Sequence, residues 1–178
     1  MTRTPVISAF LLAAAVATSV DAQSGVEQAP VDTTSINLLG ITAGFLAIPG
    51  LEAGFGLVGF HVTSINPGRL GSEFSLYLAP ETFIAKHPIV VTDISFLQSS
   101  LSENGWITLT VGGSAMFWLS SGGGGMLPGV HGGLGAIFRT GERSGIRIEI
   151  EPRFMLGIPY RLPILSTSIG LTSFPPRK

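Results

Sequence analysis

An alternation of apolar and charged side chains over residues 146–156 is the sequence feature that most constrains the fold. Successive side chains of a β-strand point to opposite faces of its sheet, so a period of two residues is typical of a strand with two different faces. One face carries Ile146, Ile148, Ile150, Pro152, Phe154 and Leu156, and the other carries Arg147, Glu149, Glu151, Arg153 and Met155. The segment therefore predicts a strand with one apolar face and one face that bears four charges of zero sum.

Similar alternation predicts seven further strands and an all-β chain. The eight predicted strands cover residues 35–48, 51–63, 73–79, 89–97, 106–119, 130–139, 146–156 and 162–174. The 24 glycines and 12 prolines disfavour long helices. Turn signals such as Asn66-Pro67-Gly68 and Glu103-Asn104-Gly105 separate the strands, and four consecutive glycines, 122–125, predict a flexible loop over residues 120–128. Such short connections favour an antiparallel, up-and-down order of strands.

The first 22 residues predict a cleaved signal peptide. Arg3 supplies a positive charge, residues 6–17 are almost all apolar, and Val20-Asp21-Ala22 is typical of a cleavage site. The apolar stretch is too short for a transmembrane helix. We therefore expect a signal peptide over residues 1–22, a periplasmic lead over 23–34, a β-barrel over 35–174 and a C-terminal tail over 175–178.

The low charge of the chain, 12% of its residues, favours a membrane barrel over a soluble one. A soluble sheet needs a charged solvent face, but the polar faces of residues 106–118 and 164–172 carry no charge. Placing an arginine at the lipid midplane costs about 2–4 kcal/mol, so the isoleucine face of residues 146–156 should meet lipid. We predict an eight-stranded antiparallel up-and-down transmembrane β-barrel; the alternative is a secreted soluble β-barrel that binds an apolar ligand in its core.

The charged face of residues 146–156 then predicts a structural charge cluster in the lumen of the barrel. The predicted cluster comprises Arg147, Glu149, Glu151, Arg153, Arg139, Glu73 and Glu52. The interior of an eight-stranded barrel is just wide enough to be filled by side chains. We therefore expect at most a narrow pore or a small-ligand site, with glycines such as Gly133 and Gly135 either leaving a narrow file of water or relieving crowding.

Two segments carry a family resemblance. Gly132-Gly133-Leu134-Gly135-Ala136-Ile137-Phe138-Arg139 and, after a tight turn, Arg147-Ile148-Glu149-Ile150-Glu151-Pro152-Arg153-Phe154 resemble the last hairpins of small bacterial outer-membrane β-barrels, the opacity-protein-like and outer-membrane β-barrel-domain families. Residues 164–174 are similar to the closing strand of these barrels. The resemblance implies a bacterial outer-membrane location, contact with outer-membrane lipid and lipopolysaccharide, and insertion by the barrel-insertion machinery.

In those families a near-terminal aromatic residue on the closing strand is the signal for the insertion machinery, and Phe174 is the matching residue here. The chain departs from the pattern in two ways. Residues 175–178 follow Phe174, whereas family members usually end at the aromatic residue. Phe174 is also out of phase with Leu165, Ile169 and Leu171, so we expect a bulge or a change of register near the end of the last strand.

Neither the composition nor the motifs predict a catalytic site, a cofactor or a metal site. The net charge of −1 gives no electrostatic case for nucleic acid, and the absence of cysteine removes thiolate chemistry. The histidines, His61, His87 and His131, are too scattered to predict a metal site. Outer-membrane lipid A deacylases show a His-x-Ser spacing, which neither His61 nor His131 has. We expect a non-enzymatic structural or accessory envelope protein, with an outer-membrane lipid-modifying hydrolase as a further alternative.

Overall fold

The computed structural model describes residues 35–48, 53–66, 69–102, 105–157 and 161–175 of the 178-residue chain. The predicted signal peptide, the predicted periplasmic lead, Glu52 and the last three residues lie outside this part of the chain. Within it, no helix is both long enough and apolar enough to cross a membrane.

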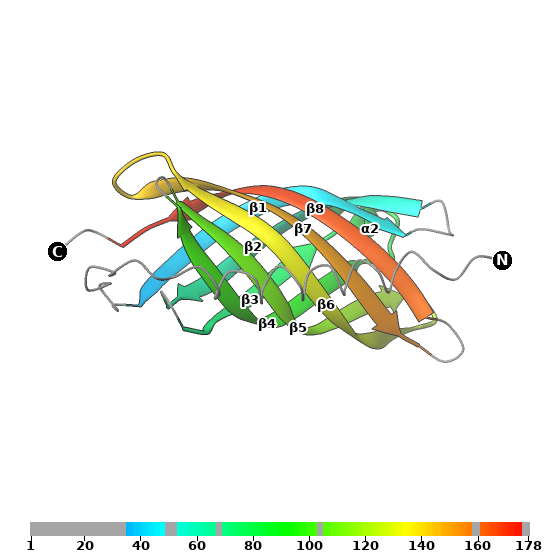
Figure 1. Ribbon diagram of the computed structural model, residues 1–178. Helices are drawn as coiled ribbons and strands as arrows, with labels where there is room; N and C mark the ends of the chain where they lie inside the picture. The colour runs from blue at the N-terminus through cyan, green and yellow to red at the C-terminus, as the bar shows by residue number, and fades with distance from the viewer. Residues whose placement is uncertain (1–34, 49–52, 67–68, 103–104, 158–160, 176–178) are drawn as a thin grey trace. The chain divides into compact units, whose positions relative to one another are not determined.

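Eight antiparallel strands form a closed barrel in which each strand pairs with its neighbour in the sequence and β8 pairs with β1 (Figure 1). The strands are β1 (Ile36–Ile48), β2 (Ala53–Ile65), β3 (Gly71–Leu78), β4 (Ile89–Ser102), β5 (Gly105–Ser120), β6 (Gly123–Arg139), β7 (Ser144–Leu156) and β8 (Arg161–Ser173). This confirms the predicted all-β, eight-stranded, up-and-down architecture.

The connection between β3 and β4 contains a short helix that the alternation did not predict, α2 (Pro80–Ile84). Proline is favoured in the first turn of a helix because its missing N–H would have no partner there. The Thr82 hydroxyl donates a hydrogen bond to the carbonyl oxygen of Ala79 at 2.6 Å and accepts one from the Ile89 N–H at 2.9 Å. Thr82 thus ties the helix to the start of β4.

The glycine run corrects a prediction, because it forms strand rather than a flexible loop over residues 120–128. β5 continues to Ser120 and β6 begins at Gly123, so only two residues turn the chain. Gly123 has a φ of 126°, which a residue with a side chain rarely adopts. The ring of Trp118 lies where a side chain on Gly125 would be. The aromatic ring therefore packs over the bare backbone, a known way to support glycine in a strand.

The apolar side of the alternation faces outward and the charged side faces into the barrel. Ile148 and Ile150 are 46% and 50% exposed, whereas Arg147 and Arg153 are each 1% exposed. Large apolar side chains on the outside of the other strands include Ile41, Val62, Ile94, Val111, Leu134 and Leu171. This distribution is the reverse of that in a soluble barrel, where the apolar faces form the core.

The interior has three layers along the barrel. At the end near α2, a helix-end plug consists of Leu46, Ile48, Leu57, Tyr77, Ala79, Val91, Met116, Met155 and Ile164. At the end where β1 begins and β8 stops, a terminus-end plug consists of Leu38, Ile65, Leu97, Trp106, Ile137 and Phe174. Buried polar side chains fill the layer between these two apolar plugs.

Phe174 corrects the predicted bulge, because it points into the barrel in phase with the inward residues of β8. The pairing of β8 with β7 runs without interruption from Arg161 to Ser173. Phe174 follows the strand, is buried, and stacks on Trp106 with ring centroids 5.5 Å apart. The aromatic side chain therefore closes the terminus-end plug, and the strand needs no change of register to place it there.

Candidate functional site

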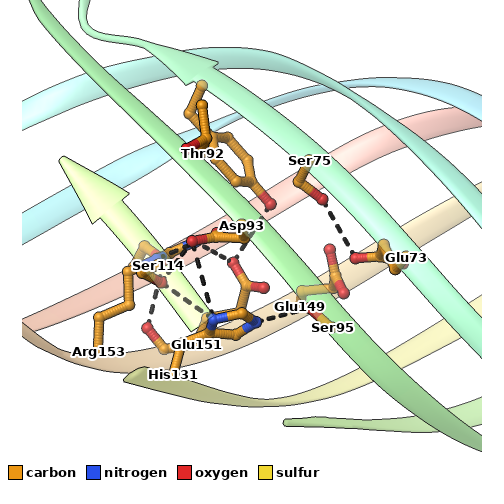
Figure 2. A network of polar contacts seen from close by, with 12 residues as sticks. Glu73, Ser75, Thr92, Asp93, Ser95, Ser114, His131, Glu149, Glu151 and Arg153 are labelled. Carbon is orange, nitrogen blue, oxygen red and sulfur yellow. Dashed lines mark hydrogen bonds and ion pairs between the residues drawn. The ribbon is translucent and has the colours of Figure 1, made fainter. Parts of the chain in front are cut away.

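The buried polar layer is the candidate functional site, and strands on different sides of the barrel build it. β7 contributes Arg147, Glu149, Glu151 and Arg153, which alternate with the outward residues Ile148, Ile150 and Pro152. The partners of these charges come from β2, β3, β4 and β8. Figure 2 shows two of these partners, Glu73 and Asp93, together with Glu149, Glu151 and Arg153 of β7. The closure of the sheet therefore brings together charges that are distant in the sequence.

Arg147 is the centre of one half of the layer. Its Nη2 donates to Glu73 Oε2 at 2.6 Å and also to Glu149 Oε1, and its Nη1 donates to the Thr63 hydroxyl at 2.8 Å. Thr63 donates in turn to Glu73 Oε2 at 2.7 Å, and Ser75 donates to Glu73 Oε1 at 3.2 Å. Glu73 on β3 and Arg147 on β7 thus form an ion pair across the interior of the barrel, between two strands that are not neighbours in the sheet.

Arg153 is the centre of the other half. Its Nη2 donates to Asp93 Oδ2 at 2.6 Å and to Glu151 Oε2 at 2.7 Å, and its Nη1 donates to the Ser166 hydroxyl. The guanidinium carbon lies 5.2 Å from the centre of the Tyr77 ring, whose hydroxyl donates to Glu151 Oε2 at 3.3 Å. Buried ion pairs of this kind need such additional hydrogen bonds to offset the loss of hydration.

His131 links a third set of polar groups to Asp93. Its Nε2 is 2.7 Å from Ser95 Oγ, and its Nδ1 is 3.0 Å from Ser114 Oγ. Ser114 donates to Asp93 Oδ1 at 2.5 Å. Serine, histidine and aspartate in hydrogen-bond reach resemble the parts of a nucleophilic triad. All four side chains are buried between the two plugs, so an ester would have to displace a plug to reach them.

The structure places the residues of the predicted charge cluster in different regions. Arg147, Glu149 and Glu73 lie in the first half of the buried layer described above, and Glu151 and Arg153 lie in the second half. Glu52 lies outside the described residues.

Arg139 is absent from the network, which corrects its place in the predicted cluster. It ends β6 beyond Ile137 of the terminus-end plug, and its guanidinium donates to the carbonyl oxygens of Gly141 and Glu142. The group also lies over the Phe174 ring, 4.8 Å from its centre. Arg139 therefore shares the inward phase of β6 but is separated from the polar layer by the plug.

Sequence reasoning missed Asp93, which pairs with Arg153 and with the His131 group. The signal that could have found it is the alternation of Val91, Asp93 and Ser95 with the outward Ile94 and Phe96. That alternation is short and begins with three apolar residues in a row, so the segment resembles an irregular strand when it is considered alone.

Glycines on β6 make room for the carboxylates of the polar layer. A methyl group on Gly135 would lie 2.7 Å from Thr108 Oγ1 and 3.0 Å from Glu149 Cγ. A methyl group on Gly133 would lie 3.1 Å from Glu151 Cγ. The glycines therefore relieve crowding, and the side chains of β5 and β7 occupy the space that they leave free.

Gly135→Ala is expected to lower the free energy of unfolding by about 1–3 kcal/mol, because the added methyl group overpacks the buried layer. The matched control is Gly113→Ala on β5, where a methyl group would meet no atom within 4 Å. We expect the control to be neutral or to stabilise by about 0.4–1 kcal/mol, since alanine restricts the unfolded chain. Urea unfolding in detergent micelles measures both, and equal stability of the two variants would contradict the crowding.

No known family profile matches the sequence, and no curated protein matches it. Several solved structures match the fold. The N-terminal β-barrel domain of OprF from Pseudomonas aeruginosa matches with a TM-score of 0.55 at 10% identity, over 78% of this chain and 99% of that chain. Ail, the attachment invasion locus protein of Yersinia pestis, matches with a TM-score of 0.53 at 10% identity, over 79% of this chain and 96% of that chain.

The fold is that of the small outer-membrane β-barrels. A third match, to Neisserial surface protein A, has a TM-score of 0.53 at 6% identity and covers 78% of this chain and 96% of that chain. The barrel of this chain thus spans nearly the full length of each of these three structures. At such low identity the likeness concerns the backbone, so the chemistry of the interior has to be argued from this chain's own residues.

Proposed function

We propose that the chain is an integral protein of the bacterial outer membrane whose barrel is a closed structural or accessory element of the envelope. The observation that carries the proposal is the reversed polarity of the barrel: apolar side chains cover its outside, and ion pairs fill its middle. An apolar outer surface of this kind is suited to contact with the hydrocarbon chains of a lipid bilayer. The likeness in fold to OprF, Ail and Neisserial surface protein A supports the same placement.

A sealed lumen is the second part of the proposal. The polar layer is buried, and an apolar plug lies on each side of it. Water or a solute crossing the barrel would have to displace both plugs and separate the Arg147 and Arg153 ion pairs. We therefore favour a barrel that does not conduct over one with a narrow pore.

The same interior supports a role without catalysis. The Ser95, His131 and Asp93 group is enclosed, which disfavours the hydrolase alternative, because a triad needs a route for its substrate. The names of the matched proteins, an attachment protein and a surface protein, agree with a non-enzymatic role. A structure of Ail in complex with the heparin analogue sucrose octasulfate has also been solved. Binding of that ligand is a property of Ail.

Outer-membrane lipid and lipopolysaccharide are the partners that the apolar outside would contact. The barrel-insertion machinery is a further expected partner, with Phe174 as its signal. In the folded barrel the Phe174 ring is buried against Trp106. The machinery would therefore have to bind Phe174 before the barrel closes.

Membrane placement predicts that the folded protein migrates differently on gels with and without boiling and stays with membranes during carbonate extraction. Spin labels at Ile148 and Ile150 should be accessible to oxygen and protected from a water-soluble relaxation agent, whereas a label at Ser144, the exposed first residue of β7, should show the opposite. Identical migration together with full carbonate extraction would refute the placement in the membrane.

The sealed lumen predicts that the protein inserted in a planar lipid bilayer gives no steady single-channel current. The heat-shifted band on the gel is the control that the sample is folded. Uniform current steps from a folded sample would overturn the sealed lumen and leave the membrane placement intact.

A further inference from the structure

We propose that the polar layer binds one divalent cation of the calcium type between Glu149 and Glu151, beside Glu73. The two glutamates are inward neighbours on β7, so their like charges lie side by side on one face of a strand. Glu73 approaches them from β3. The proposed cation goes beyond the envelope role argued above and does not depend on it.

The charge balance of the buried layer is the first argument. In the described part of the interior, the buried charged groups are four carboxylates, Glu73, Asp93, Glu149 and Glu151, and two guanidiniums, Arg147 and Arg153. The layer thus carries a net charge of −2, although each carboxylate contacts a guanidinium. A net charge in a buried layer is unfavourable, because the interior replaces water poorly. One divalent cation removes the whole imbalance.

The spacing of the carboxylates is the second argument. One oxygen from each of Glu73, Glu149 and Glu151 lies within 4.8 Å of the other two. Calcium binds oxygen ligands at about 2.4 Å, so two ligands on opposite sides of the ion are about 4.8 Å apart. The three oxygens can therefore contact a single ion after small movements of the side chains.

Two threonines without partners are the third argument. Thr108 Oγ1 and Thr110 Oγ1 are buried and form no hydrogen bond, although buried hydroxyls nearly always have a partner. Thr108 faces Glu149 over Gly135, and Thr110 faces Glu151 over Gly133, because a methyl group on either glycine would touch both side chains. These hydroxyls thus point at the same space as the carboxylates and are suitable oxygen ligands.

A second group of side chains in the layer fits a metal less well. Asp93, His131 and Glu151 also place one ligand atom each within 4.8 Å of the others. Both nitrogens of His131 already contact serine hydroxyls, so its ring has no free ligand atom. A guanidinium bridges two carboxylates in both groups, Arg153 in this one and Arg147 in the other, so the arginines do not separate them. The site over Gly133 and Gly135 offers only oxygen atoms. Oxygen ligands suit calcium, whereas magnesium usually keeps several waters, for which a sealed layer leaves little room.

The test is to fold the full chain from urea into detergent micelles with calcium chloride, with magnesium chloride or with EDTA, and to remove free ions by dialysis. We expect one calcium per chain by elemental analysis. We also expect the midpoint of thermal unfolding in calcium to exceed that in EDTA by roughly 5–10 °C when calcium is a hundredfold above its Kd. Magnesium should give a smaller shift.

Variants locate the ion. Thr110→Val keeps the size and the charge of the layer and should reduce the retained calcium, and Thr92→Val on the outward side of β4 is the matched control that should retain it. Glu149→Gln should abolish the calcium-dependent shift and, because it lowers the net negative charge of the layer from −2 to −1 while the amide oxygen can still accept from Arg147, should raise the unfolding midpoint in EDTA.

Absence of retained calcium in the unmodified chain, with equal midpoints in calcium and EDTA, would overturn the proposal. Full retention by both Thr110→Val and Glu149→Gln would also overturn it, because the ion would then lie elsewhere. In each case the heat-shifted gel band reports folding separately, so failure of the cation site leaves the envelope proposal untouched.

Discussion

Arg153→Leu is expected to lower the free energy of unfolding by about 3–5 kcal/mol, because it leaves two buried carboxylates without their cation. The lost partners are Asp93, at 2.6 Å from Nη2, and Glu151, at 2.7 Å. The leucine also gives up the hydrogen bond to Ser166 and the contact with the Tyr77 ring. Urea unfolding in micelles, followed by tryptophan fluorescence, measures the change.

Arg139→Leu is the matched control for the arginine. Arg139 lies at the mouth of the barrel, where its guanidinium bonds to two turn carbonyl oxygens that water can also reach. We expect a cost of about 1 kcal/mol or less, in the range of exposed polar contacts. If both arginine variants lost the same stability, the buried network would not be the source of the effect.

Ile150→Arg is the second large prediction, with an expected cost of about 2–4 kcal/mol for a folded barrel in a lipid bilayer. Ile150 lies in the middle of β7 and faces outward, so an arginine there would meet hydrocarbon near the midplane. Unfolding from phospholipid vesicles is the measurement, because only a bilayer imposes the full thickness of hydrocarbon.

Ser173→Arg, at the exposed end of β8, is the control for depth. The cost of a charge falls to about 0–1 kcal/mol near the membrane interface, so we expect little change in stability. An Ile150→Arg variant as stable in vesicles as the unmodified protein would contradict the lipid-facing outside and, with it, the proposed location.

Much of the barrel could be predicted from the sequence because the period of two residues and the turn residues are local signals. Residues 146–156 indicated both faces of β7 and, with the cost of an arginine in lipid, the side that faces inward. The predicted strands overlap all eight observed strands. The glycine run was predicted wrongly because glycine signals a turn by itself, whereas here pairing with β5 and the Trp118 ring keep it extended.

The partners inside the lumen could not be predicted because they depend on the stagger of strands around the whole barrel. Alternation shows that Glu73 and Arg139 share the inward side, but only the closed sheet decides which of them lies beside the charges of β7. Position along the barrel axis excluded Arg139 and brought in Asp93. Phe174 shows the same limit, because its offset from the outward residues of β8 was interpreted as a bulge, whereas the structure points the ring inward onto Trp106.

The two plugs have a consequence for the cell that carries this protein. Each additional copy of an open diffusion channel increases the permeability of the outer membrane to toxic solutes, which limits how abundant such a channel can be. Under the proposed sealed lumen, a barrel with an apolar plug at each end would add protein to the envelope without adding permeability. The protein would then be tolerated at high copy number without a cost in leakage.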